Sequence, residues 1–138
     1  MKNTSIPPSI LAELESAARS VARRAYAPYS KFCVGAAVLG DSGKIHSGCN
    51  VENASFGLTS CAERNAIFAA VGAGERAVRA VVIYTPTPTA TAPCGACRQV
   101  IHEFGPDAIV ISICDGNGRI ESTIGDLLPK SFGPEDLG

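Results

Sequence analysis

The sequence predicts an α/β domain in which helices cover a mixed sheet. Continuous apolar runs, typical of buried strands, alternate along the chain with segments whose apolar residues recur every three or four positions, as in an amphipathic helix. Clusters of glycine, proline and polar residues separate these segments, and no internal repeat or long linker divides them. With 138 residues, 46% of them hydrophobic, residues 1–138 are expected to form a single domain.

The first element is expected over residues 8–26, where apolar side chains repeat with the helical period and define one buried face. We expect Thr4 or Ser9 to cap its N-terminus, because short hydroxyl side chains accept hydrogen bonds from the free amides of a first turn. Pro28 prevents the helix from continuing, because its ring fixes φ and it has no amide hydrogen.

A β-hairpin is expected next, followed by a loop and a second helix. The runs 32–39 and 45–49 are compatible with strands, and the Gly-Asp-Ser-Gly sequence at 40–43 between them is typical of a tight turn. Residues 50–60 are small and polar, which indicates a loop. Helical spacing resumes over 61–71 and ends at a Gly-Ala-Gly sequence.

The last part of the chain is expected to contain two buried strands, at 78–84 and 108–114, because each is a short continuous apolar run. A helix over 95–104 lies between them, after a loop of alternating threonine and proline. A turn at 115–118 and a short helix over 123–128 follow the second strand.

The charge distribution argues against a nucleic-acid partner and against a membrane segment. Twelve Lys and Arg and 13 Asp and Glu give a net charge of -1, and the basic residues are scattered, with only Arg23 and Arg24 adjacent. The N-terminal segment has neither the charge nor the apolar run of a signal peptide or a membrane helix. We therefore expect a cytoplasmic protein in which the six cysteines do not form a disulfide framework, so that any paired cysteine spacing indicates metal binding or catalysis.

Two of the cysteines, Cys94 and Cys97, are separated by two residues and stand behind Pro93 at a predicted helix start. The free amides of a helix N-terminus lower the pKa of a thiol, so thiolates form readily there. On its own, this motif suits a zinc site and a thioredoxin-like redox pair about equally.

A third cysteine, Cys61, favours the zinc interpretation. It also opens a predicted helix, so two helix starts on one sheet can direct three thiolates at a single ion. Three sulfur ligands leave the fourth tetrahedral position of zinc open for water, as in catalytic sites. Glu63 can reach that position, although an acidic residue in a first turn also suits the helix dipole. Cys-x-Glu with a downstream Pro-Cys-x-x-Cys is the pattern of zinc deaminases, in which the glutamate transfers protons.

The other cysteines and the two histidines are expected to be structural. Cys33, Cys49 and Cys114 each occur singly in or beside apolar strands, where a free cysteine acts as a small hydrophobic residue. His46 and His102 have no second histidine at ligand spacing.

Five motifs extend over nearly the whole sequence: AYAPYSKFCVGAAV at 25–38, GCNVENASFG at 48–57, CAERNAIF at 61–68, PCGACRQVI at 93–101 and LLPKSFGPEDL at 127–137. Together they make the chain similar to the small homotetrameric cytidine deaminases. This resemblance implies a three-layer α/β/α sandwich with a central mixed five-stranded sheet. It also implies a homotetramer with active sites at the subunit interfaces, and a role in pyrimidine salvage.

The same resemblance implies one Zn²⁺ per subunit, bound by Cys61, Cys94 and Cys97, with Glu63 as the proton shuttle. The implied reaction is hydrolytic deamination of cytidine and 2'-deoxycytidine to the uridines, with release of ammonia. A carboxylate suits this chemistry, because adding hydroxide to C4, protonating the ring nitrogen and expelling ammonia requires a group that both accepts and donates protons.

The resemblance further implies five substrate contacts. Phe32 packs on the pyrimidine, Asn50 and Glu52 hold the ribose hydroxyls, Ala62 belongs to the binding surface, and Phe132 reaches into a neighbouring subunit's site. Asn50 and Glu52 are two positions apart, so in an extended segment both side chains can turn to one side. An amide and a carboxylate suit sugar hydroxyls, which donate and accept hydrogen bonds.

Two arginines are expected to adjust the charge of the metal site. Three thiolates make such a site negative, which weakens zinc as a Lewis acid. Arg64 follows Glu63 and Arg98 follows Cys97, so both are placed to donate hydrogen bonds to the sulfurs. Members of the family often have tyrosine where this chain has Phe56, so no polar role is expected for that residue.

Other functions stay open on the sequence alone. Close relatives deaminate other cytosine nucleosides, including aminoacyl-nucleoside antibiotics, or act on nucleic acid, but the ribose pair and the scattered charge favour a free nucleoside. A structural zinc module would need a fourth protein ligand and would have no use for Glu63. A thiol-disulfide enzyme would cycle Cys94 and Cys97 without metal.

Overall fold

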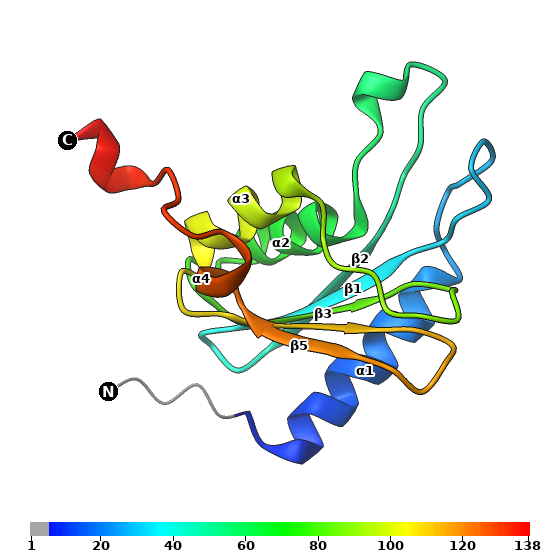
Figure 1. Ribbon diagram of the computed structural model, residues 1–138, viewed down its shortest axis with the longest axis horizontal. Coiled ribbons are helices and arrows are strands. Elements are labelled where there is room, and N and C mark those ends of the chain that lie inside the picture. The colour runs from blue at the N-terminus through cyan, green and yellow to red at the C-terminus, as the bar shows by residue number, and fades with distance from the viewer. Residues whose placement is uncertain (1–5) are drawn as a thin grey trace.

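A computed structural model of the protein describes residues 6–138 (Figure 1). In chain order its elements are α1 (Pro8–Ala22), β1 (Gly35–Gly40), β2 (Ile45–Cys49), the 3-10 helix η1 (Phe56–Leu58), α2 (Ala62–Gly72), β3 (Val78–Tyr84), α3 (Gly95–Phe104), β4 (Ile109–Ile113), β5 (Ile120–Thr123), α4 (Ile124–Leu127) and the 3-10 helix η2 (Pro134–Leu137). Within this described part, no helix combines the length and the apolar character needed to cross a membrane.

The strands form one mixed sheet in the order β2-β1-β3-β4-β5. Strand β1 is antiparallel to both β2 and β3, β3 and β4 are parallel, and β5 is antiparallel to β4. The parallel pair requires a crossover connection, and α3 supplies it. The expected mixed five-stranded sheet is therefore confirmed.

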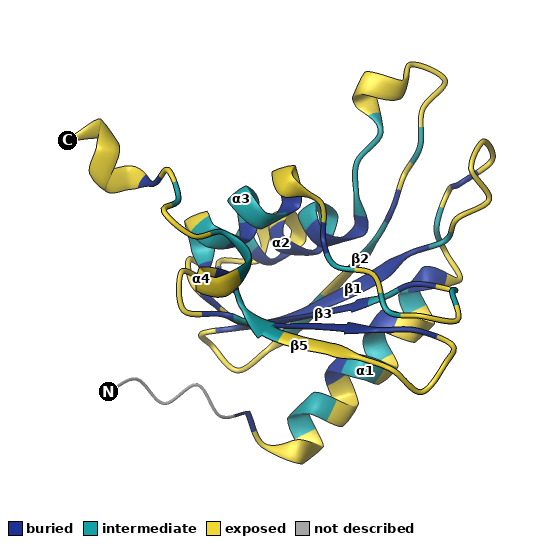
Figure 2. Cartoon of the chain, in the orientation of Figure 1, coloured by how far each residue is buried: buried dark blue, intermediate teal, exposed yellow. Residues whose placement is uncertain are grey.

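Helices cover both faces of this sheet, with α1 on one side and α2, α3 and α4 on the other (Figure 1). Side chains of β1 alternate between the two resulting cores: Ala36 and Val38 pack toward α2 and α3, whereas Ala37 and Leu39 pack toward α1. The central strands are buried along most of their length (Figure 2). This three-layer α/β/α arrangement confirms the predicted fold class.

Two glycines let the helices lie directly on the sheet. A Cβ atom at Gly48 of β2 would come 2.5 Å from the backbone nitrogen of Ala66 in α2, and one at Gly35 of β1 would come 1.9 Å from the carbonyl oxygen of Ala18 in α1. Real side chains do not tolerate such approaches, so both positions need glycine. The close contact at Gly48 fixes where α2 lies, and with it the cysteine at the start of that helix.

The first helix differs from the prediction at both ends. It ends at Ala22 rather than Tyr26, because the backbone of Tyr26 is hydrogen-bonded to the 50–52 loop: its amide donates to the carbonyl of Asn50 at 3.0 Å, and its carbonyl accepts from the amide of Glu52 at 2.8 Å. Ser9 lies inside the helix, which Pro7 precedes, so the expected Ser9 cap was wrong. The alternative cap, Thr4, lies outside the described residues.

Strand β5 was not identified from the residue pattern, although the resemblance implied a fifth strand. Its sequence, Ile-Glu-Ser-Thr, has one apolar residue, and it pairs with β4 at the edge of the sheet. An edge strand is covered less than a central one and needs no apolar run, so polar side chains are tolerated there. The other predicted strands and helices are present, with ends that differ by at most a few residues.

Candidate metal centre and substrate pocket

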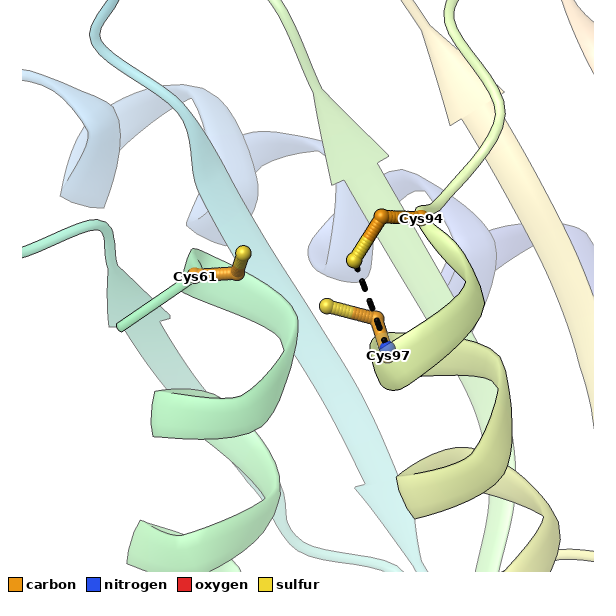
Figure 3. A group of neighbouring side chains, drawn as sticks. All are labelled: Cys61, Cys94 and Cys97. Carbon is orange, nitrogen blue, oxygen red and sulfur yellow. Dashed lines mark hydrogen bonds between the residues drawn. The ribbon is translucent and has the colours of Figure 1, made fainter. Parts of the chain in front are cut away.

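Two neighbouring helix starts bring three cysteines together (Figure 3). Cys61 immediately precedes α2, Cys94 immediately precedes α3, and Cys97 lies in the first turn of α3. The three Sγ atoms all lie within 4.8 Å of one another. The predicted convergence of the three sulfurs is thus present in the structure.

Local hydrogen bonds hold the start of α3 in this geometry. The Cys94 Sγ accepts a hydrogen bond from the amide of Cys97 at 3.5 Å, as a capping side chain does (Figure 3). The Arg98 guanidinium donates to the carbonyl oxygen of Pro93, just before α3, at 2.8 Å and to that of Leu127, at the end of α4, at 2.9 Å. These contacts fix the backbone that carries Cys94 and Cys97.

The start of α2 is held by Asn65. Its side-chain amide donates to the carbonyl of Cys49 at 2.8 Å, its Oδ1 accepts from the Ser60 hydroxyl at 2.8 Å, and its backbone amide donates to the carbonyl of Cys61 at 3.1 Å. Asn65 therefore connects the segment just before α2, which includes Cys61, to the end of β2.

The three sulfurs have the chemistry and spacing of a zinc site. Tetrahedral Zn–S bonds of about 2.3 Å place sulfur ligands about 3.8 Å apart, which the 4.8 Å limit of this cluster accommodates. Among the described residues, no fourth histidine, cysteine or carboxylate joins the cluster. A structural zinc module would supply four protein ligands, so the cluster has the composition of a catalytic site with one position left for water or substrate.

Hydrogen bonding favours thiolate formation in the cluster. A hydrogen bond from the Cys97 thiol, with further contributions from Arg64, lowers the pKa of Cys61 to about 5, and the same bond raises the pKa of Cys97. The Arg64 Nη2 donates to the Cys61 Sγ at 3.2 Å. Zinc binds thiolates, so a site that already stabilises one thiolate is suited to the ion.

Arg64 also retains an unused donor beside the sulfurs. Its Nε is buried without a hydrogen-bond partner, the one such side-chain atom among the described residues. An unpaired buried N–H next to thiolates can stabilise additional negative charge in the cluster. Arg98 differs from its prediction, because its hydrogen bonds within the described chain go to backbone carbonyls and not to a sulfur.

Glu63 lies in the first turn of α2 with its side chain facing the same cavity as Cys61 and Cys94. It is 6% exposed, and this burial, more than the nearby Cys61 charge, raises the pKa of its carboxyl group. A carboxyl group with a raised pKa holds a proton more readily near neutral pH, as a group that both accepts and returns protons must.

The cavity itself has a volume of about 220 Å³. Besides Glu63, five of the predicted site residues line it: Phe32, Asn50, Cys61, Ala62 and Cys94. Cys97 is not among the lining residues. Sequence reasoning missed three threonines that also line it, Thr59, Thr85 and Thr91. Thr85 directly follows β3, and the carboxyl end of a parallel strand is the usual place for ligand contacts, so its position was the available signal.

Asn50 and Glu52 occupy adjoining cavities. Asn50 is buried, with its Oδ1 accepting from the amide of Val34 at 2.9 Å and its Nδ2 donating to the carbonyl of Phe32 at 2.7 Å. The Asn50 side-chain amide therefore fixes the segment that carries Phe32. This segment is not part of a strand, because the strand predicted over 32–39 begins only at Gly35.

Glu52 lines a neighbouring cavity of about 280 Å³, which shares Thr59 with the first. Its carboxylate accepts from the backbone amides of Tyr29 at 3.0 Å and Ser30 at 3.2 Å, and from the Ser30 hydroxyl. The Ser30 hydroxyl is the main cause of its lowered pKa. The carboxylate is thus kept charged and oriented at the outer end of the site.

Phe132 lines neither the cavity beside the cysteines nor the one that contains Glu52. Its side chain is 59% exposed, and its carbonyl accepts a hydrogen bond from Gln99 Nε2 at 2.9 Å. Figure 1 shows the C-terminal segment, and separately the loop that carries η1, extending from the body of the molecule. Phe56 in that loop is 75% exposed and touches Tyr29 with ring centroids 6.2 Å apart.

The residues expected to be structural lie outside the metal cluster. Cys114 is buried and donates to the carbonyl of Gly118 at 3.2 Å, while Cys33 and Cys49 are partly buried. His46 contacts Glu75 at 2.9 Å, and His102 contacts Ser131 at 3.1 Å. Neither histidine is part of the three-cysteine cluster.

Comparison with known proteins identifies the family. The family model described as the cytidine and deoxycytidylate deaminase zinc-binding region matches residues 9–113. The cytidine deaminase of Sporosarcina psychrophila is 44% identical over 126 residues, covering 91% of this chain and 93% of the relative. That of Halalkalibacterium halodurans is 46% identical over 114 residues, covering 82% and 86% respectively.

The chain belongs to the cytidine and deoxycytidylate deaminase zinc-binding family. Solved structures agree with this membership. The crystal structure of cytidine deaminase from Burkholderia pseudomallei has a TM-score of 0.84 and 46% sequence identity, covering 88% of this chain and 98% of that one. Cytidine deaminase from Mycobacterium tuberculosis has a TM-score of 0.75 and 38% identity, covering 89% and 97%. For a zinc-binding deaminase, the three-cysteine cluster is the candidate metal centre.

Proposed function

We propose that this protein is a zinc-dependent cytidine deaminase, which hydrolyses cytidine and 2'-deoxycytidine to the uridines and releases ammonia. The observation that carries the proposal is the buried Glu63 in a cavity lined also by Cys61 and Cys94, two members of a three-cysteine cluster that has no fourth protein ligand among the described residues. Family membership and relatives named cytidine deaminase support the choice of substrate.

Cys61, Cys94 and Cys97 would hold the zinc ion, which when bound lowers the pKa of a coordinated water and so supplies a nucleophile near neutral pH. Glu63 carries out the proton transfers: its carboxylate takes up a proton from water and returns it at the ring nitrogen N3. A second proton passes from the hydroxyl added at C4 through the same carboxyl group to the C4 amino group; the C4–N bond then breaks, ammonia leaves, and the oxygen becomes the C4 carbonyl of the uridine. The burial of Glu63 keeps bulk water away from these transfers.

The substrate would lie with its base at the metal end and its sugar at the outer end of the site. The Phe32 ring and the start of α2 at Ala62 form walls of the cavity against which the pyrimidine can pack. Asn50 and Glu52 would meet the ribose hydroxyls, with the Glu52 carboxylate already oriented by Ser30. A site with a ribose pair at this end favours a free nucleoside over a base or a nucleic acid.

Arg64 would moderate the negative charge of three thiolates. Its hydrogen bond to the Cys61 Sγ draws charge from one ligand, and its unpaired Nε can draw further charge. Arg98 would act on the same centre only through the backbone, by fixing the start of α3.

We further propose that residues 1–138 form one deaminase domain that assembles as a homotetramer, with Phe132 entering a neighbour's site. Large exposed apolar side chains on the extended segments support this, among them Phe56, Leu58 and Phe132. Pyrimidine salvage in the cytoplasm is the role proposed for such an enzyme. Scattered charge gives it no nucleic-acid surface, and no membrane partner is proposed.

The proposal is tested by following ammonia release from cytidine, 2'-deoxycytidine, cytosine and an oligonucleotide, with and without a zinc chelator. We expect both nucleosides to react, the free base and the oligonucleotide to be inert, and chelation to stop the reaction. Zinc-loaded protein that fails to act on either nucleoside would contradict the proposed function.

A further inference from the structure

A third cavity, on the α1 side of the sheet, has no part in the proposed deamination. Its volume is about 580 Å³, and six residues line it: Arg19, Ala22, Arg23, Cys33, Tyr84 and Pro86. The first three lie at the C-terminal end of α1. A volume of roughly 300–1,000 Å³ is typical of sites for small molecules.

This cavity and the substrate pocket share backbone segments but no side chains. Phe32 and Val34 face the substrate pocket, whereas Cys33 between them lines the α1-side cavity. The end of β3 alternates in the same way, with Tyr84 on the side of the α1-side cavity. Because successive side chains of an extended segment point to opposite faces, the two cavities can be occupied at the same time.

Two guanidinium groups border the α1-side cavity without a carboxylate partner. Arg19 and Arg23 are four positions apart on α1, and no ion pair within 4.0 Å is formed by either with the described residues. Arg19 donates to the carbonyl of Cys114 at 3.2 Å and lies 4.9 Å from the Tyr84 ring centroid. Arg23 makes one long hydrogen bond, 3.4 Å, to the Ser20 hydroxyl. Most of the donors of both groups are therefore available to a ligand.

The helix dipole explains why basic residues are tolerated at the end of α1, but it does not explain why two of them border a cavity. Like charges four positions apart on a helix repel each other, and an anion between them would remove that repulsion. Two acidic groups lie near these arginines in the structure or along α1: Asp115 accepts a hydrogen bond from the Tyr84 hydroxyl at 2.5 Å, and Glu15, four positions before Arg19, pairs with Arg119 at 2.7 Å. Asp115 thus positions the ring below Arg19 and forms no ion pair with either arginine.

We propose that the α1-side cavity is a binding site for a small phosphate monoester. Two guanidinium groups on one helix face can bind separate oxygens of one phosphate group, whereas a carboxylate has only two oxygens and suits a single arginine. Ala22, Pro86 and the Cys33 thiol offer a less polar surface for the organic part of the ligand. The site is independent of the deaminase reaction, so its test does not require activity.

Cys33 gives a direct measure of whether the α1-side cavity is occupied. Zinc-loaded protein is saturated with uridine and treated with iodoacetamide, and the alkylation rate of the Cys33 peptide is followed by mass spectrometry. The added probes are uridine 5'-monophosphate, ribose 5-phosphate, inorganic phosphate and, as a neutral control, ribose. A ligand that covers the thiol, present at ten times its dissociation constant, slows alkylation about tenfold.

Two variants separate this site from a general charge effect. Arg23→Gln removes a guanidinium with one long hydrogen bond and leaves the contacts of Arg19 in place. The matched control is Arg24→Gln, which removes the same charge from the next residue of the helix end, outside the cavity lining. Each rate is compared with the same variant's rate without ligand, and the folding of both is checked by thermal unfolding.

We expect both monoesters to protect Cys33 in the wild type and in Arg24→Gln, and protection to fall at least severalfold in Arg23→Gln. Protection that is equal in all three proteins would overturn the proposal, as would its absence at millimolar monoester. Equal protection by ribose or by inorganic phosphate would also overturn it, because the ligand would then need no phosphate group or no organic part.

Discussion

The metal end and the ribose end of the candidate site differ in how much one chain supplies. At the metal end, three sulfurs lie within 4.8 Å of one another and Glu63 is 6% exposed. At the ribose end, Glu52 is partly exposed, and Phe132, which is proposed to enter a neighbour's site, is 59% exposed on a segment that extends from the body (Figure 2). One chain thus preorganises the chemistry, whereas Glu52 and Phe132 are more exposed to solvent, and the proposed homotetramer would cover them.

This contrast follows from the elements that carry each end. The metal ligands stand at the starts of two helices that pack on the sheet, and rigid elements hold catalytic groups more precisely than loops do. The proposed ribose contacts lie outside the regular elements: Asn50 and Glu52 are in the loop that follows β2, and Phe132 is in the segment between α4 and η2. Substitutions at the metal end should therefore reduce turnover, and substitutions at the ribose end should raise KM.

The largest effect is expected from Glu63→Gln, which keeps the size of the side chain and removes its ability to transfer protons. We expect kcat for cytidine to fall by about 10²- to 10⁴-fold with one zinc still bound per chain, as measured by ammonia release and metal analysis. Glu103→Gln, on the exposed face of α3, is the matched control and should behave as the wild type. Full activity of Glu63→Gln would remove the proposed proton shuttle.

A smaller loss is expected from Arg64→Gln, again at the metal end. Without the hydrogen bond to the Cys61 Sγ, the sulfurs keep more negative charge and zinc becomes a weaker Lewis acid. We expect kcat to fall about 10- to 100-fold at unchanged zinc content, with partial recovery in Arg64→Lys. If turnover is unchanged while zinc is retained, Arg64 has no role in adjusting the metal centre.

At the ribose end, Phe132→Ala should act on binding. Loss of one aromatic contact is worth about 0.5–1.5 kcal/mol, so KM for cytidine should rise up to about tenfold while kcat changes little. Leu137→Ala, a more exposed apolar residue of the same segment, is the control and should leave KM unchanged. A loss confined to kcat would place Phe132 at the metal end and contradict the proposed division of the site.

The smallest effect on activity is expected from Glu75→Gln, because Glu75 lies outside both the metal end and the ribose end of the site. Hydrogen bonds from Ser42 and then from His46 lower the pKa of Glu75 to about 2, from an ordinary value of 4.5. Its stabilising contribution is complete above pH 4.5 and is lost as the pH falls toward 2.

Glu75→Gln should therefore unfold at a lower temperature than the wild type above pH 4.5, and the gap should narrow at lower pH. Turnover at neutral pH should be unchanged. A gap that widens on acidification would show that the Glu75 carboxylate does not stabilise the fold.

The sequence predicted the metal end better than the ribose end for physical reasons. Cysteine spacing and helix periodicity are local signals, so the sequence alone indicates that Cys61, Glu63, Cys94 and Cys97 belong to one centre. The contacts of Asn50 and Glu52 depend on segments some 16 to 23 positions away, and nothing in the local pattern indicated them.

Two other differences between the sequence predictions and the structure also arise from contacts between distant parts of the chain. Arg98 was expected to donate to a sulfur because it follows Cys97, but the carbonyl of Leu127, 29 positions away, takes one of its hydrogen bonds. Strand β5 has a polar sequence because it lies at the edge of the sheet, which is a property of the topology and not of the residue pattern.

The division of the site between chains is tested most directly by mixing two defective proteins. Chains with Glu63→Gln keep an intact Phe132, and chains with Phe132→Ala keep an intact metal end. In tetramers assembled at random from equal amounts, about a quarter of the sites combine a functional Glu63 with a neighbour's Phe132. At subsaturating cytidine, where both variants are impaired, we predict recovery of about a quarter of the wild-type rate after co-assembly. A rate no higher than the average of the two separate variants would contradict a shared site.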